Sequence, residues 1–130
     1  MTRRAILSLA LVVLAACRRD PLPVGERGDR DEAAGRRIFE RKCASCHNTN
    51  GDGDTITGSR FPYANLIDGV WRSDGSVAAI EQQVRVGHDP MPKFEGKLTD
   101  EEIRQVAAYV AELAHAAEAT RRATPGPPAR

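Results

Sequence analysis

Cys43-Ala44-Ser45-Cys46-His47 places two thiols and an imidazole within five residues. Two cysteines separated by two residues and followed at once by a histidine form the C-x-x-C-H pattern of covalent haem attachment. The thiols can add to the two vinyl groups on one edge of a porphyrin, and the adjacent imidazole can bind the iron from one face. The sequence therefore predicts one covalently bound haem c, held by Cys43 and Cys46, with His47 as an axial iron ligand.

A second axial ligand is predicted in the segment His88-Asp89-Pro90-Met91-Pro92. Pro90 has a fixed φ, and Pro92 disfavours the α region for the residue before it. Met91 is also the only methionine besides Met1. We therefore expect Met91 to present its thioether from a stiff, extended loop as the second iron ligand. His88 is the competing candidate, whereas His115 lies off the apolar stripe of its helix and is expected at the surface.

Other metal and redox chemistries account for these residues less well. A thioredoxin-like C-x-x-C motif needs a βαβ setting, whereas this chain is predicted to contain helices and loops. A structural zinc site needs four ligands, and only His88 and His115 remain to complete one. Asp52-Gly53-Asp54 suggests calcium, but the further ligands and terminal glutamate of an EF-hand loop are missing.

The N-terminus has the organisation of an export signal. Met1-Thr2-Arg3-Arg4 precedes a 12-residue run from Ala5 to Ala16 that only Ser8 interrupts, whereas a membrane span needs about 20 apolar residues. We predict a signal peptide over residues 1–16. Leu14-Ala15-Ala16-Cys17 resembles the lipobox of bacterial lipoproteins, which implies lipidation of Cys17 and a membrane anchor facing the periplasm or extracytoplasmic space. Plain secretion is the alternative.

The rest of the chain divides into a tether, one domain and a tail. The composition predicts a lipidated N-terminus and flexible tether over residues 17–30, and a disordered Pro/Gly-rich tail over residues 120–130. Residues 31–119 are left for a single small domain. The formal charge is +1, and 17 basic against 18 acidic residues remain without Arg3 and Arg4. Such a balance indicates no nucleic-acid partner.

Three helices are predicted within the domain. The first spans residues 32–42. The second is capped by Ser76, buries Val77, Ile80 and Val84, and ends at Gly87. The third begins with Thr99-Asp100-Glu101-Glu102, which fits a capping box. Its apolar residues follow at helical spacing: Ile103, Val106, Ala107, Val110, Leu113 and Ala114.

Taken together, these residues resemble the class I monohaem cytochrome c family. The resemblance rests on the C-x-x-C-H motif and on three later segments: Met91-Pro92-Lys93-Phe94, Leu98-Thr99-Asp100-Glu101-Glu102-Ile103 and Tyr109-Val110. It implies a small all-α cytochrome c fold of three to five helices around one haem. It also implies that Gly35 and Phe39 cross the last helix at Tyr109. Trp71 and the helix that ends at Gly87 are similar to haem domains attached to bacterial terminal oxidases.

One segment departs from the family pattern. Family members often have a proline before the leucine near Leu66, and the carbonyl group of that proline accepts a bond from the proximal imidazole. Here the segment reads Pro62-Tyr63-Ala64-Asn65-Leu66. The carbonyl group that orients His47 is therefore left open by the sequence.

The predicted function is single-electron transfer between respiratory redox partners that dock transiently at the haem edge, and not enzyme catalysis. Ligation by His47 and Met91 would saturate the iron, and the cofactor itself would carry the electron. A haem sensor or peroxidase-like enzyme with a displaceable Met91 is the alternative. Four basic residues could line a docking surface or simply form a solvated face: Arg60, Arg85, Lys93 and Lys97.

Overall fold

The structure, a computed structural model, describes residues 24–124 and is built from helices joined by irregular loops. The elements follow in the order α1 (Val24–Lys42), α2 (Ala44–His47), the 3-10 helix η2 (Gly58–Arg60), α3 (Val77–Val86) and α4 (Asp100–Ala123). Strand-like pairing within these residues is limited to two isolated bridges, His88 with Met91 and Glu95 with Leu98. The predicted small all-α fold is confirmed.

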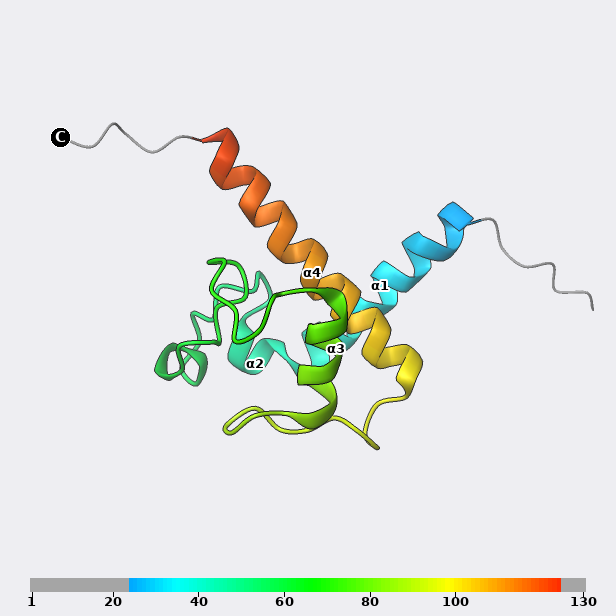
Figure 1. The fold of residues 1–130 in the computed structure, drawn as a ribbon, viewed down its shortest axis with the longest axis horizontal. Coiled ribbons are helices and arrows are strands. Elements are labelled where there is room, and N and C mark those ends of the chain that lie inside the picture. The colour runs from blue at the N-terminus through cyan, green and yellow to red at the C-terminus, as the bar shows by residue number, and fades with distance from the viewer. Residues whose placement is uncertain (1–23, 125–130) are drawn as a thin grey trace, which may run out of the picture.

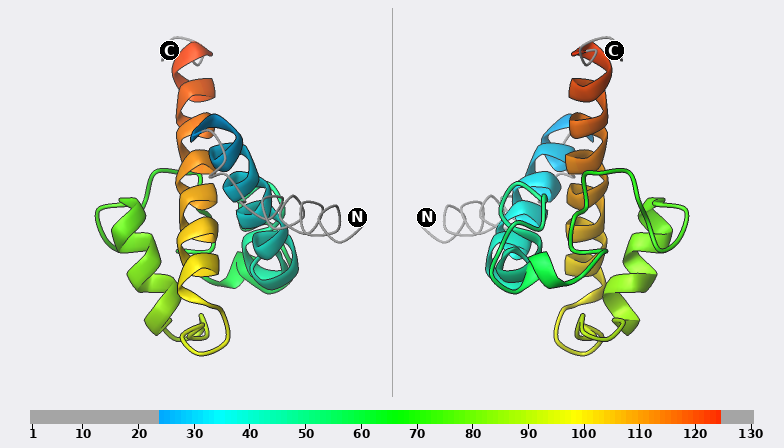
Figure 2. Two further views of the ribbon diagram at one scale, coloured as in Figure 1. Left: turned by 90° about the vertical axis from the view of Figure 1, so that its right-hand side faces the viewer. Right: turned by 90° about the vertical axis from the view of Figure 1, so that its left-hand side faces the viewer.

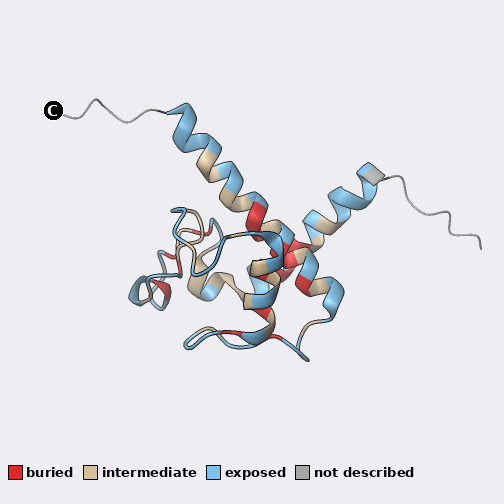
Figure 3. Ribbon diagram, in the orientation of Figure 1, coloured by how far each residue is buried: buried red, intermediate tan, exposed pale blue. Residues whose placement is uncertain are grey.

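The centre of the fold is the crossing of α1 and α4 (Figure 1), where most of the buried residues gather (Figure 3). A Cβ atom at Gly35 would collide with the carbonyl oxygen of Gln105 and lie 2.9 Å from Tyr109 Cβ. Phe39 is fully buried, and its ring centroid lies 5.5 Å from that of Tyr109. The missing side chain of Gly35 therefore lets the two helices cross closely, as the sequence predicted.

Helices α1 and α3 lie on opposite sides of α4 (Figure 2). The side chain of Ser76 caps α3 by accepting a hydrogen bond from the Ala79 amide, and Gly87 ends it with φ 68°. Thr99 and Glu102 form the predicted capping box of α4. Val77 is the first residue of α3, and it is 40% exposed. The prediction that Val77 is buried was wrong.

Both long helices extend further than the sequence suggested. α1 begins at Val24 instead of residue 32, so residues 24–30 of the predicted tether are helical. Residues 25–30 are exposed and extend a helix whose later turns are packed. Each glycine in this extension lowers the stability of the helix by up to about 1 kcal/mol. α4 continues to Ala123, where the predicted tail had begun at residue 120. The signal peptide, Cys17 and the tail from residue 125 lie outside the described residues.

The last turns of α4 are held by ion pairs with one glutamate. Glu118 accepts hydrogen bonds from Arg121 at 2.6 Å and from Arg122 at 2.7 Å. Pairs at i,i+3 and i,i+4 each stabilise a helix by about 0.2–0.5 kcal/mol.

None of the helices formed by residues 24–124 is long and apolar enough to cross a membrane.

The acidic loop after α2 is held by hydrogen bonds of its own. Asp52 accepts bonds from the side chains of Asn48 and Asn50 and from the backbone amide of Asp54, and these bonds lower the pKa of the Asp52 carboxyl. Within residues 24–124 no three His, Cys, Asp or Glu side chains are grouped to hold a metal ion.

Candidate functional site

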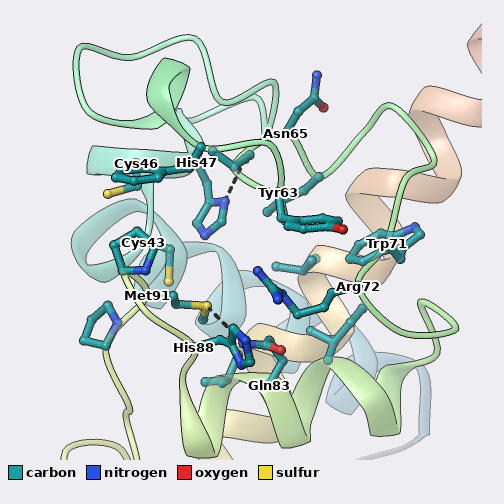
Figure 4. Close-up of a pocket in the computed structure, with 18 of the residues that line it drawn as sticks. Cys43, Cys46, His47, Tyr63, Asn65, Trp71, Arg72, Gln83, His88 and Met91 are labelled. Carbon is teal, nitrogen blue, oxygen red and sulfur yellow. Dashed lines mark hydrogen bonds between the residues drawn. The ribbon is translucent and has the colours of Figure 1, made fainter.

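A cavity of about 390 Å³ lies between α2, α3, α4 and the loops that follow η2 and α3. Its volume falls in the ~300–1,000 Å³ range of cofactor and ligand pockets. Aliphatic and aromatic side chains from all parts of the domain form most of its wall: Phe39, Phe61, Leu66, Val70, Trp71, Ile80, Val84, Phe94, Val106 and Val110. The predicted site residues Cys43, Cys46, His47 and Met91 all line this one cavity (Figure 4).

The first wall of the cavity is the single helical turn α2. Cys43, the residue that joins α1 to this turn, donates its amide to the Phe39 carbonyl of α1 at 2.8 Å and accepts from the His47 amide at 3.0 Å. Cys43 and Cys46 are both free and half-buried. Burial, and secondarily the neighbouring Cys46, raises the pKa of the Cys43 thiol to about 11. Both cysteines thus line the cavity as free thiols.

His47 is oriented by the backbone of the loop that follows η2. Its Nδ1 donates to the carbonyl oxygen of Ala64 at 2.7 Å. Burial lowers the pKa of His47, although the bond to Ala64 raises it somewhat, and the net lowering favours the neutral form of the ring. A neutral imidazole that donates from Nδ1 keeps a free lone pair on Nε2, which is the usual arrangement of a metal-binding histidine. The carbonyl group that orients His47, which the sequence left open, is therefore that of Ala64.

Two glycines allow the loop to place the Ala64 carbonyl next to His47. A Cβ atom at Gly53 would lie 2.7 Å from the carbonyl carbon of Ala64, so backbone packs directly on backbone there. Gly53 has φ 71° and Gly51 has φ 81°, a region that L side chains rarely adopt. The Leu66 amide then donates to the Gly51 carbonyl at 2.7 Å. The register of this contact selects Ala64 as the partner of His47, two residues after Pro62.

Met91 faces His47 from the opposite side of the cavity (Figure 4). His88 and Met91 exchange both backbone hydrogen bonds, at 2.9 and 2.7 Å, so the segment forms a tight turn that includes the cis peptide bond Asp89–Pro90. Gly87 lets this turn close, because a Cβ there would lie 2.5 Å from the Lys93 amide nitrogen. His88 also lines the cavity, although it is exposed. The structure thus brings both candidate distal ligands to the site.

Sequence reasoning missed two polar residues of the cavity. Gln83 donates from Nε2 to the Met91 sulfur at 3.9 Å. Gln83 lies on α3 three residues after Ile80 and next to Val84, and this spacing could have indicated that it shares the buried face of the helix. The guanidinium of Arg72 lies 4.5 Å from the ring centroid of Tyr63, at the side of the cavity away from the cysteines (Figure 4). No sequence pattern singled it out.

The four basic residues considered for docking lie outside the cavity wall, where Lys42 and Arg72 supply the positive charge. Arg60, Lys93 and Lys97 are exposed. Arg85 is bound to Asp100 at 2.5 Å.

A helical frame around one cavity walled by two thiols, an imidazole and a thioether is the architecture of a small c-type cytochrome. The family model described as "Cytochrome C oxidase, cbb3-type, subunit III" matches residues 30–110. The cytochrome c6 of Leptolyngbya boryana is 37% identical over 84 residues, which make up 65% of this chain and 94% of that protein. The chain therefore belongs to the class I monohaem cytochrome c family, as the sequence predicted.

Further relatives and a solved structure agree with this family. The cytochrome c6 of Limnospira maxima is 39% identical over 88 residues, covering 65% of this chain and 94% of that protein. The crystal structure of cytochrome c6 from the diatom Phaeodactylum tricornutum is similar with a TM-score of 0.55 and 35% identity, and the match covers 67% of this chain and 98% of that chain. The protein is thus an electron carrier and not an enzyme, with one covalently bound haem c.

Proposed function

We propose that the protein is a membrane-anchored cytochrome that carries single electrons between respiratory redox partners. In this proposal Cys43 and Cys46 form the thioether bonds to haem, and His47 and Met91 are the two axial ligands. Cys17 carries the lipid that anchors the exported domain to the cell membrane, facing the periplasm or extracytoplasmic space. Redox proteins dock transiently at the haem edge.

The hydrogen bond from His47 Nδ1 to Ala64 carries the ligand assignment. It fixes the tautomer of the ring and leaves Nε2 as the only nitrogen able to bind a metal. The Met91 sulfur lies across the same cavity. His88 supports the rival assignment less well, because its side chain is exposed whereas Met91 is half-buried.

The cysteine pair supports covalent attachment. Cys43 and Cys46 are free cysteines that line the cavity beside the His47 imidazole. Each S–H would add across one vinyl C=C, so that a C–S bond forms and the proton ends on the neighbouring carbon, with no oxidant consumed. The bound haem supplies a one-electron ferric/ferrous couple. The chain itself holds that group, shields it with apolar side chains and closes both axial positions.

The anchor and the partners follow from other parts of the chain. The lipobox-like segment ending at Cys17 supports lipidation, and multiple acyl chains give stable membrane attachment. The family matches support redox proteins as partners. Tyr63 and Arg72 pair with each other, line the cavity and are exposed, so they offer a contact surface for such a protein.

The experiment that tests this proposal is mass and pyridine-haem analysis of the protein extracted from membranes. We expect one haem per chain that resists acid–acetone extraction and an N-terminus that begins at an acylated Cys17. Haem that can be extracted would contradict the thioether assignment. An unmodified mature N-terminus in the soluble fraction would contradict the anchor and leave the haem assignment intact.

A further inference from the structure

The end of α4 contacts a loop that is remote in sequence. The family match ends at residue 110, whereas α4 continues to Ala123. Leu113, Ala117 and Arg121 follow one another at spacings of four residues and therefore share one face of the helix. Leu113 and Ala117 are half-buried. This face is turned to the loop that follows η2.

The helix face meets that loop at Ile67, and Leu113 and Ile67 together cover Gly51 in the loop before η2. The Leu113 Cδ2 atom lies 2.7 Å, and the Ile67 Cγ2 atom 3.1 Å, from the place that a Cβ at Gly51 would take, so both side chains cover Gly51. Two turns later Arg121 donates from Nη1 to the Ile67 carbonyl. The other end of the guanidinium is held by Glu118, with Nη2 donating at 2.6 Å.

The same loop carries the acceptor of the proximal imidazole. Ile67, bound by Arg121, is three residues after Ala64, which accepts the bond from His47 at 2.7 Å. Between them, the Leu66 amide donates to the Gly51 carbonyl at 2.7 Å. Residues 64–67 are therefore held by three hydrogen bonds, one from Arg121 on α4, one to Gly51 and one from His47.

We infer that Arg121 is a positioning residue, which fixes the loop of residues 64–67 and thereby the hydrogen bond that His47 donates to Ala64. This inference rests on the proposed function, because it matters for electron transfer only when His47 binds the iron. A carbonyl that accepts firmly from Nδ1 makes the imidazole more basic and favours the ferric state. Loosening the loop weakens that bond, so the midpoint potential rises.

The test uses the full-length, haem-loaded protein and three variants. R121Q removes the bond to the Ile67 carbonyl together with one ion pair. R122Q is the matched control, because Arg122 also pairs with Glu118, at 2.7 Å, and is more exposed. R121K keeps a charged donor at the site. The readouts are the midpoint potential and the exchange rate of the Leu66 amide, which a general loss of helix stability would not shift selectively.

For R121Q we expect the midpoint potential to rise by ~28 mV. This shift corresponds to about a threefold change in the equilibrium constant with a reference couple, since a tenfold change is 59 mV for one electron. We also expect the Leu66 amide to exchange about tenfold faster. R122Q should match the wild type, and R121K should recover at least half of the shift. Equal potentials in R121Q and R122Q would overturn the inference, even with lower stability. A wild-type spectrum without histidine ligation would overturn the proposed function, and this inference with it.

Discussion

The imidazole of His47 and the carbonyl oxygen of Ala64 are joined by a 2.7 Å hydrogen bond that spans 17 residues of sequence. This bond connects the helical turn that carries both cysteines with the loop that follows η2. It leaves Nε2 of a neutral ring as the metal-binding atom. The proposed binding of iron by His47 depends on this orientation.

Replacing Met91 should open the iron to external ligands. M91L keeps the side-chain volume but removes the sulfur atom, so the ferric protein should lose its methionine-to-iron charge-transfer band and the ferrous protein should bind carbon monoxide. The potential should fall, since thioether ligation favours the ferrous state. H88Q is the control, and its band should be unchanged. A wild-type protein without the band, together with carbon monoxide binding in H88Q and not in M91L, would show that His88 is the ligand.

Replacing Gln83 should change the potential without changing the ligands. Q83L removes the hydrogen bond from Nε2 to the Met91 sulfur, so the sulfur donates more strongly to ferric iron and the potential should fall. A hydrogen bond of ~1 kcal/mol corresponds to about 40 mV for one electron. Redox titration measures the shift. Q82L alters the exposed neighbour, and an equal fall in both variants would contradict the role of the sulfur contact.

The helix crossing should tolerate no side chain at Gly35. G35A places a methyl group against the carbonyl oxygen of Gln105 and should cost about 1–3 kcal/mol of unfolding free energy. G28A lies in the same helix with nothing within 4 Å, and should stabilise by up to about 1 kcal/mol. Guanidinium denaturation of the haem-loaded proteins measures both. The two substitutions should change the unfolding free energy in opposite directions. An unchanged unfolding free energy in G35A would contradict the close helix crossing.

Replacing Cys17 should release the protein from the membrane. C17S removes the thiol that would be acylated, so the protein should move from the membrane fraction to the soluble fraction, with its haem spectrum unchanged. Fractionation followed by mass analysis of the N-terminus measures this. C17S that stays in the membrane with a processed N-terminus would point to another means of attachment.

Local signals in the sequence predicted much of the frame and the site. The Ser76 cap and the Thr99–Glu102 capping box act through neighbouring residues, and the structure confirms both. The C-x-x-C-H motif is equally local, and its residues line the cavity. The prolines around Met91 predicted a rigid loop but not its tight turn. These features can be derived because the interacting groups are close in the sequence.

Other features depend on contacts between distant segments and could not be derived. The choice of Ala64 comes from backbone packing against Gly53, and no single-sequence rule gives that register. The early start of α1 at Val24 was missed because Gly25 and Gly28 are typical of a tether. Arg121 lay in the predicted tail, so its contact with Ile67 became visible only with the fold.

The optical spectrum of the intact, haem-loaded protein tests the central claim most directly. Ligation by His47 and Met91 predicts a methionine-to-ferric-iron charge-transfer band and a ferrous spectrum that carbon monoxide does not change. The first feature reports the thioether ligand, and the second reports that both axial positions are closed. A ferric protein without the band, or a ferrous protein that binds carbon monoxide rapidly, would contradict the account.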